Sequence, residues 1–502
     1  MEQTTVILTT LVVYKLTLIG IGFWARARTQ DNEDFFLGGR ALGPVVGAIS
    51  YSCSASSAYA LLGVSGIAYV IGVSAFWIVG GALIGATLSW VWIAPRLMAY
   101  SNEHRHLTLT DVLVHGYSGT IRTVIVRTAA LIIVFTFVFY VAAQFQGAGN
   151  TFASTFDLSM IESILIGATI IAIYTLLGGF WAVSVTDTLQ GLLMALTAVL
   201  LPIVALVQIG GFSEFFAQLA AVSSPQQLSW TAGNAGLVAA GVVAGSLSIS
   251  FGAYGQPHMM VRYMAMRDEK SLRQAGVISI FWYFVVYIGM CSLGLMGHVL
   301  FPMTDNPESV FFVLTENLFP PVIAGILLAA VLSAVMSTAD SQLLVSGSAV
   351  AHDLGISSGD AGRKLLISRI AIIFLVMLSA LVALYLPESI FNRVLVAWVA
   401  LGAAFGPTLI FRLAGIRLKP LGVLLSIVTG FAAASTFYLM PDTPGDILER
   451  MAPFVLATTV LIVFRDRVAG GGGGGGAPPG GGGGREEAPP PERKGKTKNG
   501  GA

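Results

Sequence analysis

Thirteen apolar segments, each about as long as a membrane-spanning helix, follow one another along this chain. A helix needs roughly 20 apolar residues to cross the hydrocarbon core of a bilayer. The segments lie near residues 4–25, 43–69, 73–98, 121–147, 160–178, 183–209, 236–259, 275–300, 320–350, 367–386, 390–412, 418–439 and 450–464. Backbone polar groups within lipid must be satisfied inside the chain, so the pattern predicts an all-α polytopic membrane protein of about 13 transmembrane helices.

The basic residues lie almost entirely in alternate loops. If the N-terminus is outside, every one of the 27 Lys and Arg residues except Lys15, Arg393 and Arg450 falls in a cytoplasmic loop or in the cytoplasmic C-terminal end. In this assignment Arg262 belongs to a cytoplasmic loop. The positive-inside rule therefore predicts a multi-pass protein of the cell membrane with an outside N-terminus and a cytoplasmic C-terminus. The net charge of +1 gives no reason to expect a nucleic-acid partner.

Composition divides the chain into two parts. Residues 1–468 form the expected transmembrane domain, whereas residues 469–502 are rich in Gly and Pro and are expected to form a disordered cytoplasmic tail. The only two cysteines, Cys53 and Cys291, both fall within apolar segments, so neither a disulfide framework nor a zinc motif is expected. We find no nucleophile–base pair or phosphate-binding loop in a plausible context, and an enzyme is not expected.

Two of the apolar segments are interrupted by small and polar residues. In segment 43–69 the middle, residues 50–59, reads SYSCSASSAY, and segment 236–259 contains Gly241, Gly245, Gly252, Gly255 and Pro257. Broken helices are tolerated in a membrane only where they line a cavity or a site. The two segments lie five helices apart, which is the spacing of an inverted repeat of five plus five helices. We therefore expect a solute or an ion to bind at these interruptions.

Two carboxylates lie well inside the apolar segments, Asp187 and Asp340. Ser337, Asp340 and Ser341 are spaced to share one helix face, and their oxygens are suitable ligands for a hard monovalent cation. No Arg or Lys is expected at the depth of these carboxylates. Lys15 in the first segment is expected to extend to the membrane surface or to pack peripherally.

Five stretches of the sequence resemble motifs of the sodium:solute symporter family, in particular its sodium/proline symporter branch. They are residues 36–44 (FLGGRALGP), 178–190 (GGFWAVSVTDTLQ), 255–258 (GQPH), 324–344 and 402–407 (GAAFGP). The resemblance covers about residues 1–465 with the motifs in family order. It implies helices arranged as in the leucine transporter, and solute uptake driven by sodium without any other cofactor.

The resemblance also implies roles for individual residues. By position, the sodium site of the family falls on the backbone carbonyls of Cys53, Ser56 and Ala334 and on the hydroxyls of Ser337 and Thr338. A second cation site falls on Asp187, Asp340 and Ser341. The substrate region corresponds to Ser57, Ala58, Ile249, Gly252 and Ala253.

Several positions depart from the proline-transporter pattern. Ala55 and Ala75 stand where that branch has acidic residues, and Ile249 and Ala253 replace an aromatic pair that faces the substrate. We expect these replacements to enlarge the pocket and to remove its aromatic wall. Asp340 occupies a position that is often Ser, and we hypothesise that it restores the missing negative charge.

These observations predict sodium-coupled symport of a small organic solute, an amino acid such as proline or a related compound, into the cell. The sequence leaves two alternatives open. One is a proton-coupled relative of the same fold, suggested by Ala55 and Asp340. The other is a transport-like solute sensor that acts through a separate partner protein.

Overall fold

The computed structural model describes residues 3–26, 37–177, 180–304, 306–354, 361–386 and 388–466, and these residues belong to one unit, Met1–Asp466. The predicted tail, residues 469–502, lies outside the described residues. The first half contains α1 (Gln3–Arg26), α3 (Pro44–Ala58), α4 (Val64–Ile71), α5 (Phe76–Leu88), α6 (Ala94–His104), α7 (Leu109–Leu113), α8 (Gly119–Phe156), α9 (Met160–Leu177) and α10 (Phe180–Ile209). The second half contains α11 (Phe212–Val222), α12 (Gly236–Leu247), α13 (Pro257–Met264), α14 (Glu269–Leu300), α15 (Val310–Leu318), α16 (Pro321–Ser348), α17 (Ala361–Tyr385), α18 (Ile390–Leu413), α19 (Pro420–Tyr438) and α20 (Ile447–Phe464).

The prediction of an all-α membrane fold is confirmed. Each predicted apolar range coincides with a helix or with a pair of helices joined by an irregular turn, and no strand occurs in the described ranges beyond two isolated bridges. Among the described residues, eleven helical runs are long and apolar enough to cross a membrane. One of them, Pro44–His104, contains 61 residues and reverses at Gly72, whose φ is 69°. The figure of thirteen crossings remains a prediction.

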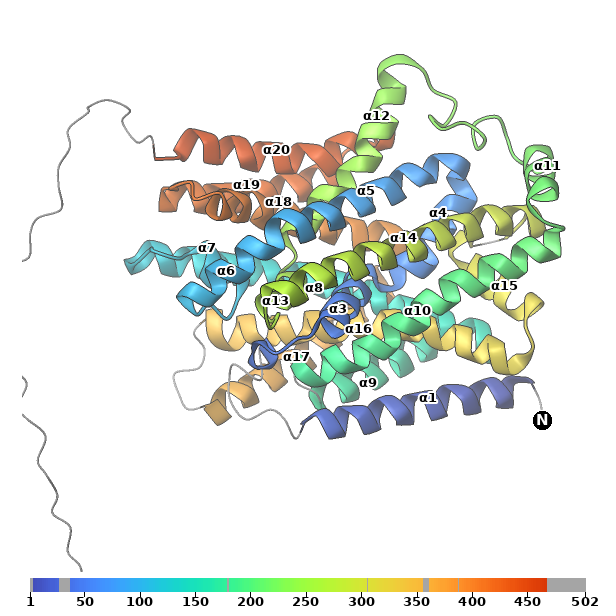
Figure 1. Cartoon of the computed structure of the whole chain (residues 1–502), viewed down its shortest axis with the longest axis horizontal. Helices are drawn as coiled ribbons and strands as arrows, with labels where there is room; N and C mark the ends of the chain where they lie inside the picture. Colours follow the sequence, from blue (N-terminus) through green and yellow to red (C-terminus); the bar gives the residue numbers. More distant parts are fainter. Residues whose placement is uncertain are drawn as a thin grey trace, which may run out of the picture. The chain divides into compact units, whose positions relative to one another are not determined.

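The helices pack in layers around α16. The apolar window of α16 is 83% buried inside the protein, against 17% for α1 and 22% for α20, so α16 is central and the other two are peripheral. Figure 1 shows α1 along one edge of the bundle and α19 and α20 along the opposite edge, with α3 and α16 between them. The lipid-facing helices expose large apolar side chains, such as Leu16 and Val463. A bilayer is the solvent in which such a surface is stable.

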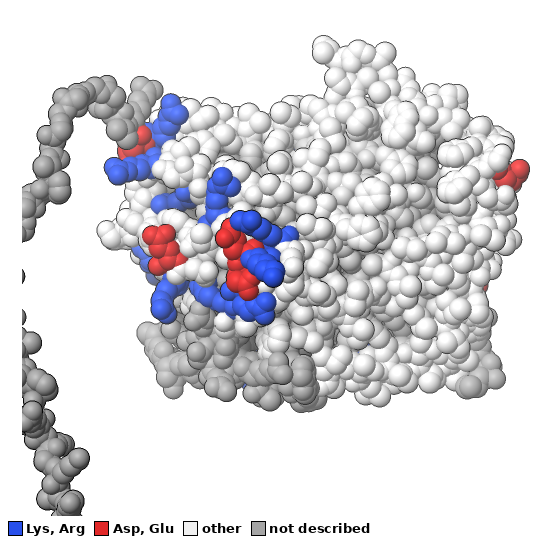
Figure 2. Space-filling view, in the orientation of Figure 1, with Lys and Arg blue, Asp and Glu red and all other residues white. Residues whose placement is uncertain are grey.

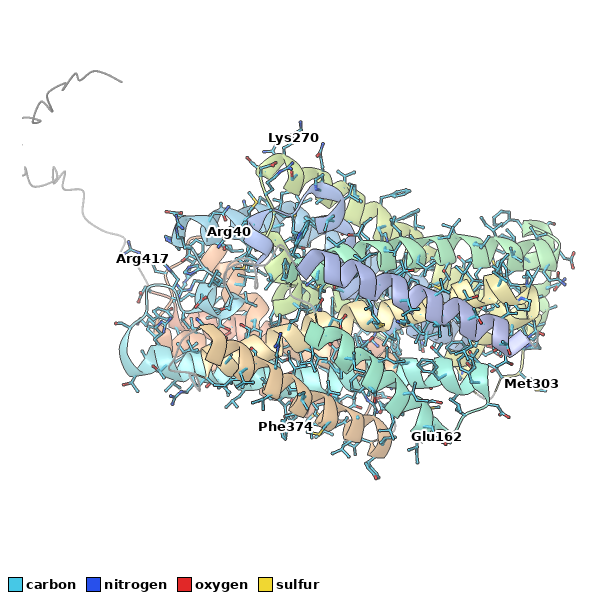
Figure 3. All side chains as sticks on the ribbon, turned by 90° about the horizontal axis from the view of Figure 1, so that it is seen from below. Arg40, Glu162, Lys270, Met303, Phe374 and Arg417 are labelled. Atoms are coloured by element: carbon cyan, nitrogen blue, oxygen red, sulfur yellow. The ribbon has the colours of Figure 1, made fainter. Side chains whose placement is uncertain are left out.

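Charged side chains gather at one end of the helices. In Figure 2 the visible Lys and Arg residues, with most of the visible Asp and Glu, cluster at the end that carries α6 and the start of α14, and the long flank beside them is uncharged. Figure 3 places Arg40 and Arg417 toward this end and Glu162 and Met303 toward the other. The uncharged flank is where the hydrocarbon core would lie.

Both predicted interruptions are present in the structure. In α3 the backbone of Ser57 adopts φ 54° and ψ −170°, which breaks the helix just past the middle of the apolar segment 43–69. In the second segment α12 gives way to a 3₁₀ stretch, Ser248–Gly255, and an extended Gln256 before α13 begins at Pro257. Pro257 has no N–H to donate, and its ring favours a fresh helix start at that position.

Candidate functional site

The break in α3 lies directly against α16. The hydroxyl of Thr338 donates to the carbonyl of Ser54 (3.0 Å), and the hydroxyl of Ser54 donates to the carbonyl of Ser337 (3.2 Å). The thiol of Cys53 lies 2.9 Å from the Ser337 hydroxyl, which itself donates to the carbonyl of Ala334 (3.2 Å). These contacts bring Cys53, Ala334, Ser337 and Thr338 together, with Ser56 three residues further along α3.

The break leaves backbone groups that the rest of the protein satisfies. A regular helix would direct the N–H of Ala58 to the carbonyl of Ser54. Here that N–H donates instead to the Oε1 atom of Gln144 in α8 (3.0 Å), and the Ser54 carbonyl accepts from Thr338. The hydroxyl of Ser56 is buried and has no hydrogen-bond partner among the described residues. Carbonyl and hydroxyl oxygens of this kind suit a dehydrated monovalent cation.

Asp187 in α10 forms a buried ion pair with Arg262 of α13. Their side chains are 1% and 2% exposed, and Nη2 of Arg262 lies 3.0 Å from Oδ2 of Asp187. The same guanidinium donates to the hydroxyls of Ser54 (2.7 Å), Ser341 (2.6 Å) and Ser50 (3.1 Å). The expectation that no basic residue reaches the depth of the carboxylates was therefore wrong. The break between α12 and α13 turns the chain inward, so Arg262 is buried and not in a loop.

Asp340 points away from this network. Its side chain accepts a hydrogen bond from the Thr175 hydroxyl of α9, while Ser337 and Ser341 face α3. The expectation that Ser337, Asp340 and Ser341 act on one face was wrong for Asp340. Successive residues of an α-helix are rotated by about 100° around its axis, so the Asp340 side chain can point to α9 while that of Ser341 faces α3. The structure thus joins Asp187 to Ser341 through Arg262 and leaves Asp340 on the side of α9.

Lys15 does not extend to the membrane surface. Its ammonium group contacts the sulfur of Met336 in α16, and the adjacent Tyr14 hydroxyl bonds to Ser333 of the same helix. The expectation that Lys15 extends to the membrane surface was wrong, because α1 directs this pair of polar residues toward α16; packing at the periphery of the bundle agrees with the other expectation.

A small cavity lies on the other side of the α3 break. It is lined by Ala55, by the predicted residues Ile249 and Ala253, and by side chains of α5, α14 and α18. Its volume of about 20 Å³ holds little more than one water molecule. An amino acid does not fit into this volume, so a solute can bind in the cavity only after the surrounding helices move.

The cavity has an aromatic wall, contrary to expectation. Tyr59, Tyr140, Tyr283, Tyr287 and Trp398 all line it. The Trp398 indole donates to the carbonyl of Ile249 (3.0 Å) and packs on Gly252, where a Cβ atom would collide with the ring. Trp398 of α18 thus places an aromatic ring beside Ile249 and Gly252, and the expected loss of an aromatic wall is wrong. The enlargement of the pocket relative to proline transporters stays a prediction.

The remaining predicted positions lie beside the cavity and not in its lining. Ala58 contacts Gly147 and Gln144 of α8, Ser57 is the break itself, and Ala75 is buried at the start of α5. Sequence reasoning missed Arg262, Gln144 and the four tyrosines. A Gln and several Tyr residues in the middle of apolar segments were the available signal, since buried polar atoms need partners.

Two interrupted helices that line one cavity, with carbonyl and hydroxyl oxygens beside the first interruption, are the arrangement of a secondary transporter. Comparison with known proteins identifies the family. The model of the sodium:solute symporter family matches residues 35–430, and the chain belongs to this family of transporters.

The chain is similar to individual members of known name. It is 33% identical to the osmoregulated proline transporter OpuE of Bacillus subtilis over 90% of this chain and 94% of OpuE. It is also 33% identical to the sodium/proline symporter of Salmonella typhimurium over 92% and 93% of the two chains. In fold it resembles a Na+-coupled sialic acid symporter (TM-score 0.75, 19% identity, 92% and 99% covered) and the nucleobase-cation symporter Mhp1 (TM-score 0.53, 12% identity, 87% and 96% covered).

Proposed function

We propose that this protein couples the inward movement of sodium to the uptake of a small organic solute, an amino acid such as proline or a related compound. The observation that carries the proposal is the broken helix α3, whose Ser54 carbonyl accepts from the Thr338 hydroxyl and whose Cys53 thiol lies against the Ser337 hydroxyl. The proline-transporting relatives at 33% identity support the choice of solute class.

In the proposed mechanism, sodium binds between α3 and α16 and orders the break at Ser57. Its ligands would be the carbonyls of Cys53, Ser56 and Ala334 and the hydroxyls of Ser337 and Thr338. The ordered break shapes the cavity beside Ala55, so sodium and solute stabilise each other's binding. Joint occupancy permits closure, after which the opposite side opens and releases both.

In this structure the Arg262 guanidinium forms an ion pair with Asp187 and a hydrogen bond to Ser341, and thus occupies the place where a cation would bind them. For a second sodium to bind at Asp187 and Ser341, the guanidinium would have to withdraw. We therefore propose that Asp187 and Ser341 hold no second sodium while this pair is formed. The alternatives of proton coupling and of solute sensing make different predictions in the assay below.

The experiment is uptake of labelled proline by proteoliposomes under an inward sodium gradient or an inward proton gradient. Sodium-driven accumulation is expected, and Thr338→Ala should raise the sodium concentration for half-maximal uptake at least tenfold. Thr458→Ala in α20 is the matched control, because that hydroxyl only bonds to the carbonyl of Phe454 within its own helix. Accumulation driven by protons alone, or solute binding without flux, would contradict the proposal.

The charge distribution supports an orientation with the C-terminus in the cytoplasm, since the basic end of Figure 2 would face inward. The two native cysteines are buried, so added cysteines can be labelled selectively. An impermeant maleimide applied to whole cells should label Met303→Cys, whose native side chain is 93% exposed, and not the exposed Lys270→Cys. Labelling of Lys270→Cys alone would reverse the orientation.

A further inference from the structure

Lys15 lies at the middle of a membrane-spanning helix. It has eleven residues of α1 on its C-terminal side and twelve on its N-terminal side, so roughly 17 Å of helix separates it from either end. A lysine side chain cannot span that distance to reach water. An ammonium group at this depth therefore needs a partner within the protein.

The partner of Lys15 lies on α16. Its ammonium contacts the sulfur of Met336, which is a weak acceptor. Met336 and Asp340 are four residues apart on one helix, so the carboxylate sits one turn beyond this contact, on the same face. The Asp340 carboxylate therefore lies about one helical turn from the contact of the Lys15 ammonium with Met336, a separation at which opposite charges attract each other in apolar surroundings.

Asp340 in turn lacks a counter-ion of its own. It is fully buried, one carboxylate oxygen accepts from Thr175, and the other has no hydrogen-bond partner among the described residues. Asp187, the other carboxylate deep within the apolar segments, is already paired with Arg262. Within the part of the chain that the structure describes, Lys15 is thus the basic group left to compensate Asp340.

The surroundings of Lys15 also favour this pairing. The residue lines a groove of about 340 Å³ between α1, α9 and α16 whose other walls are almost wholly apolar. In such surroundings an ammonium gains little from hydration, and pairing with a carboxylate one helical turn away becomes its most favourable interaction.

We propose that Lys15 is the built-in counter-ion of Asp340 and takes the place of a second coupling cation at that carboxylate. A tethered ammonium supplies the charge that a second sodium would otherwise bring, so one sodium is coupled to each solute. The pair also fixes the peripheral helix α1 to the central helix α16. The statement about sodium rests on the proposed function, whereas the statement about the pair does not.

The first test is a double-mutant cycle on thermal unfolding of the purified, detergent-solubilised protein. Lys15→Met and Asp340→Asn should each lower the unfolding midpoint, since each leaves one buried group uncompensated. The double variant should recover at least half of the loss produced by the worse single variant. Lys270→Met, an exposed lysine at the start of α14, is the control and should leave the midpoint unchanged. Additive losses would overturn the pair, whatever the protein transports.

The second test is the sodium dependence of proline uptake by proteoliposomes. The wild type should show a Hill coefficient for sodium near one, and Lys15→Met should raise it, because the uncompensated Asp340 then recruits a cation. The double variant should return it to the wild-type value. A Hill coefficient near two in the wild type, or an unchanged Hill coefficient in Lys15→Met, would contradict the proposal that the Lys15 ammonium takes the place of a second sodium. Absence of any sodium-driven uptake by the wild type would instead refute the proposed function, while the unfolding cycle would still decide the pair.

Discussion

Removal of the Arg262 guanidinium should destabilise the protein more than removal of any surface charge. In Arg262→Met the Asp187 carboxylate stays buried, with the hydroxyls of Ser50 (2.7 Å) and Ser54 (3.2 Å) as its remaining donors. The second carboxylate oxygen already lacks a partner among the described residues. The variant thus leaves a charge in a site that is 1% exposed.

The expected magnitude follows from this burial. Breaking a buried ion pair by removing one partner costs about 3–5 kcal/mol. The double variant Arg262→Met/Asp187→Asn removes both charges, so it should lose less than the sum of the single variants, with a coupling energy of about 0.5–3 kcal/mol. An exposed ion pair serves for comparison. Arg273 and Glu269 on α14 are 76% and 63% exposed, and such a pair contributes about 0.3–0.5 kcal/mol to stability.

Thermal unfolding of the detergent-purified variants ranks them by their loss of stability. Arg262→Met should lower the midpoint strongly, the double variant less than the two single changes together, and Arg273→Met hardly at all. If Arg262→Met shifted the midpoint no more than Arg273→Met, the pair would not be a buried charge network. Additive losses would refute the coupling.

Three further outcomes are expected. Gln144→Leu leaves the buried N–H of Ala58 without an acceptor, and this should cost about 1–3 kcal/mol in unfolding experiments; a variant as stable as the wild type would show that the break caps itself. Trp398→Ala should open space beside Gly252 and weaken solute binding more than sodium binding, as measured by separate half-saturation constants, and equal effects would contradict a role in the cavity wall. Partial burial lowers the pKa of His106 from 6.5 to about 4, so its folded form stays neutral while the unfolded chain takes up a proton. Stability should therefore fall as pH falls from 6.5 toward 4, less so in His106→Gln, and an identical pH profile in the variant would exclude this histidine as the cause.

The fold class could be predicted because each membrane segment carries its own signal. A segment such as 121–147 or 275–300 needs only local apolar length to be recognised, since lipid forces its backbone to bond within the helix. The interruptions were also visible locally: the hydroxyls at residues 50–57 and the Gly and Pro residues around Pro257 do not suit lipid. The break itself falls within the first of these runs, at Ser57.

Partners between distant segments could not be predicted in the same way. Arg262 was placed in a loop because it follows Pro257 at the end of an apolar run, yet the extended Gln256 directs α13 back into the protein. The aromatic wall was judged lost from Ile249 and Ala253 alone. Trp398, 149 residues away, fills that position, and no local pattern indicates which helix faces which.

The sequence by itself therefore determined that the chain is a membrane transporter, where its helices break, and which family it belongs to, because burial in lipid and family motifs are properties of single segments. Only the tertiary structure decided the charge partners: Arg262 for Asp187, and α1 with Lys15 beside α16. Electrostatic energy in a low-dielectric interior depends on distances of a few ångströms between residues far apart in the chain. Those distances arise only when the helices have packed.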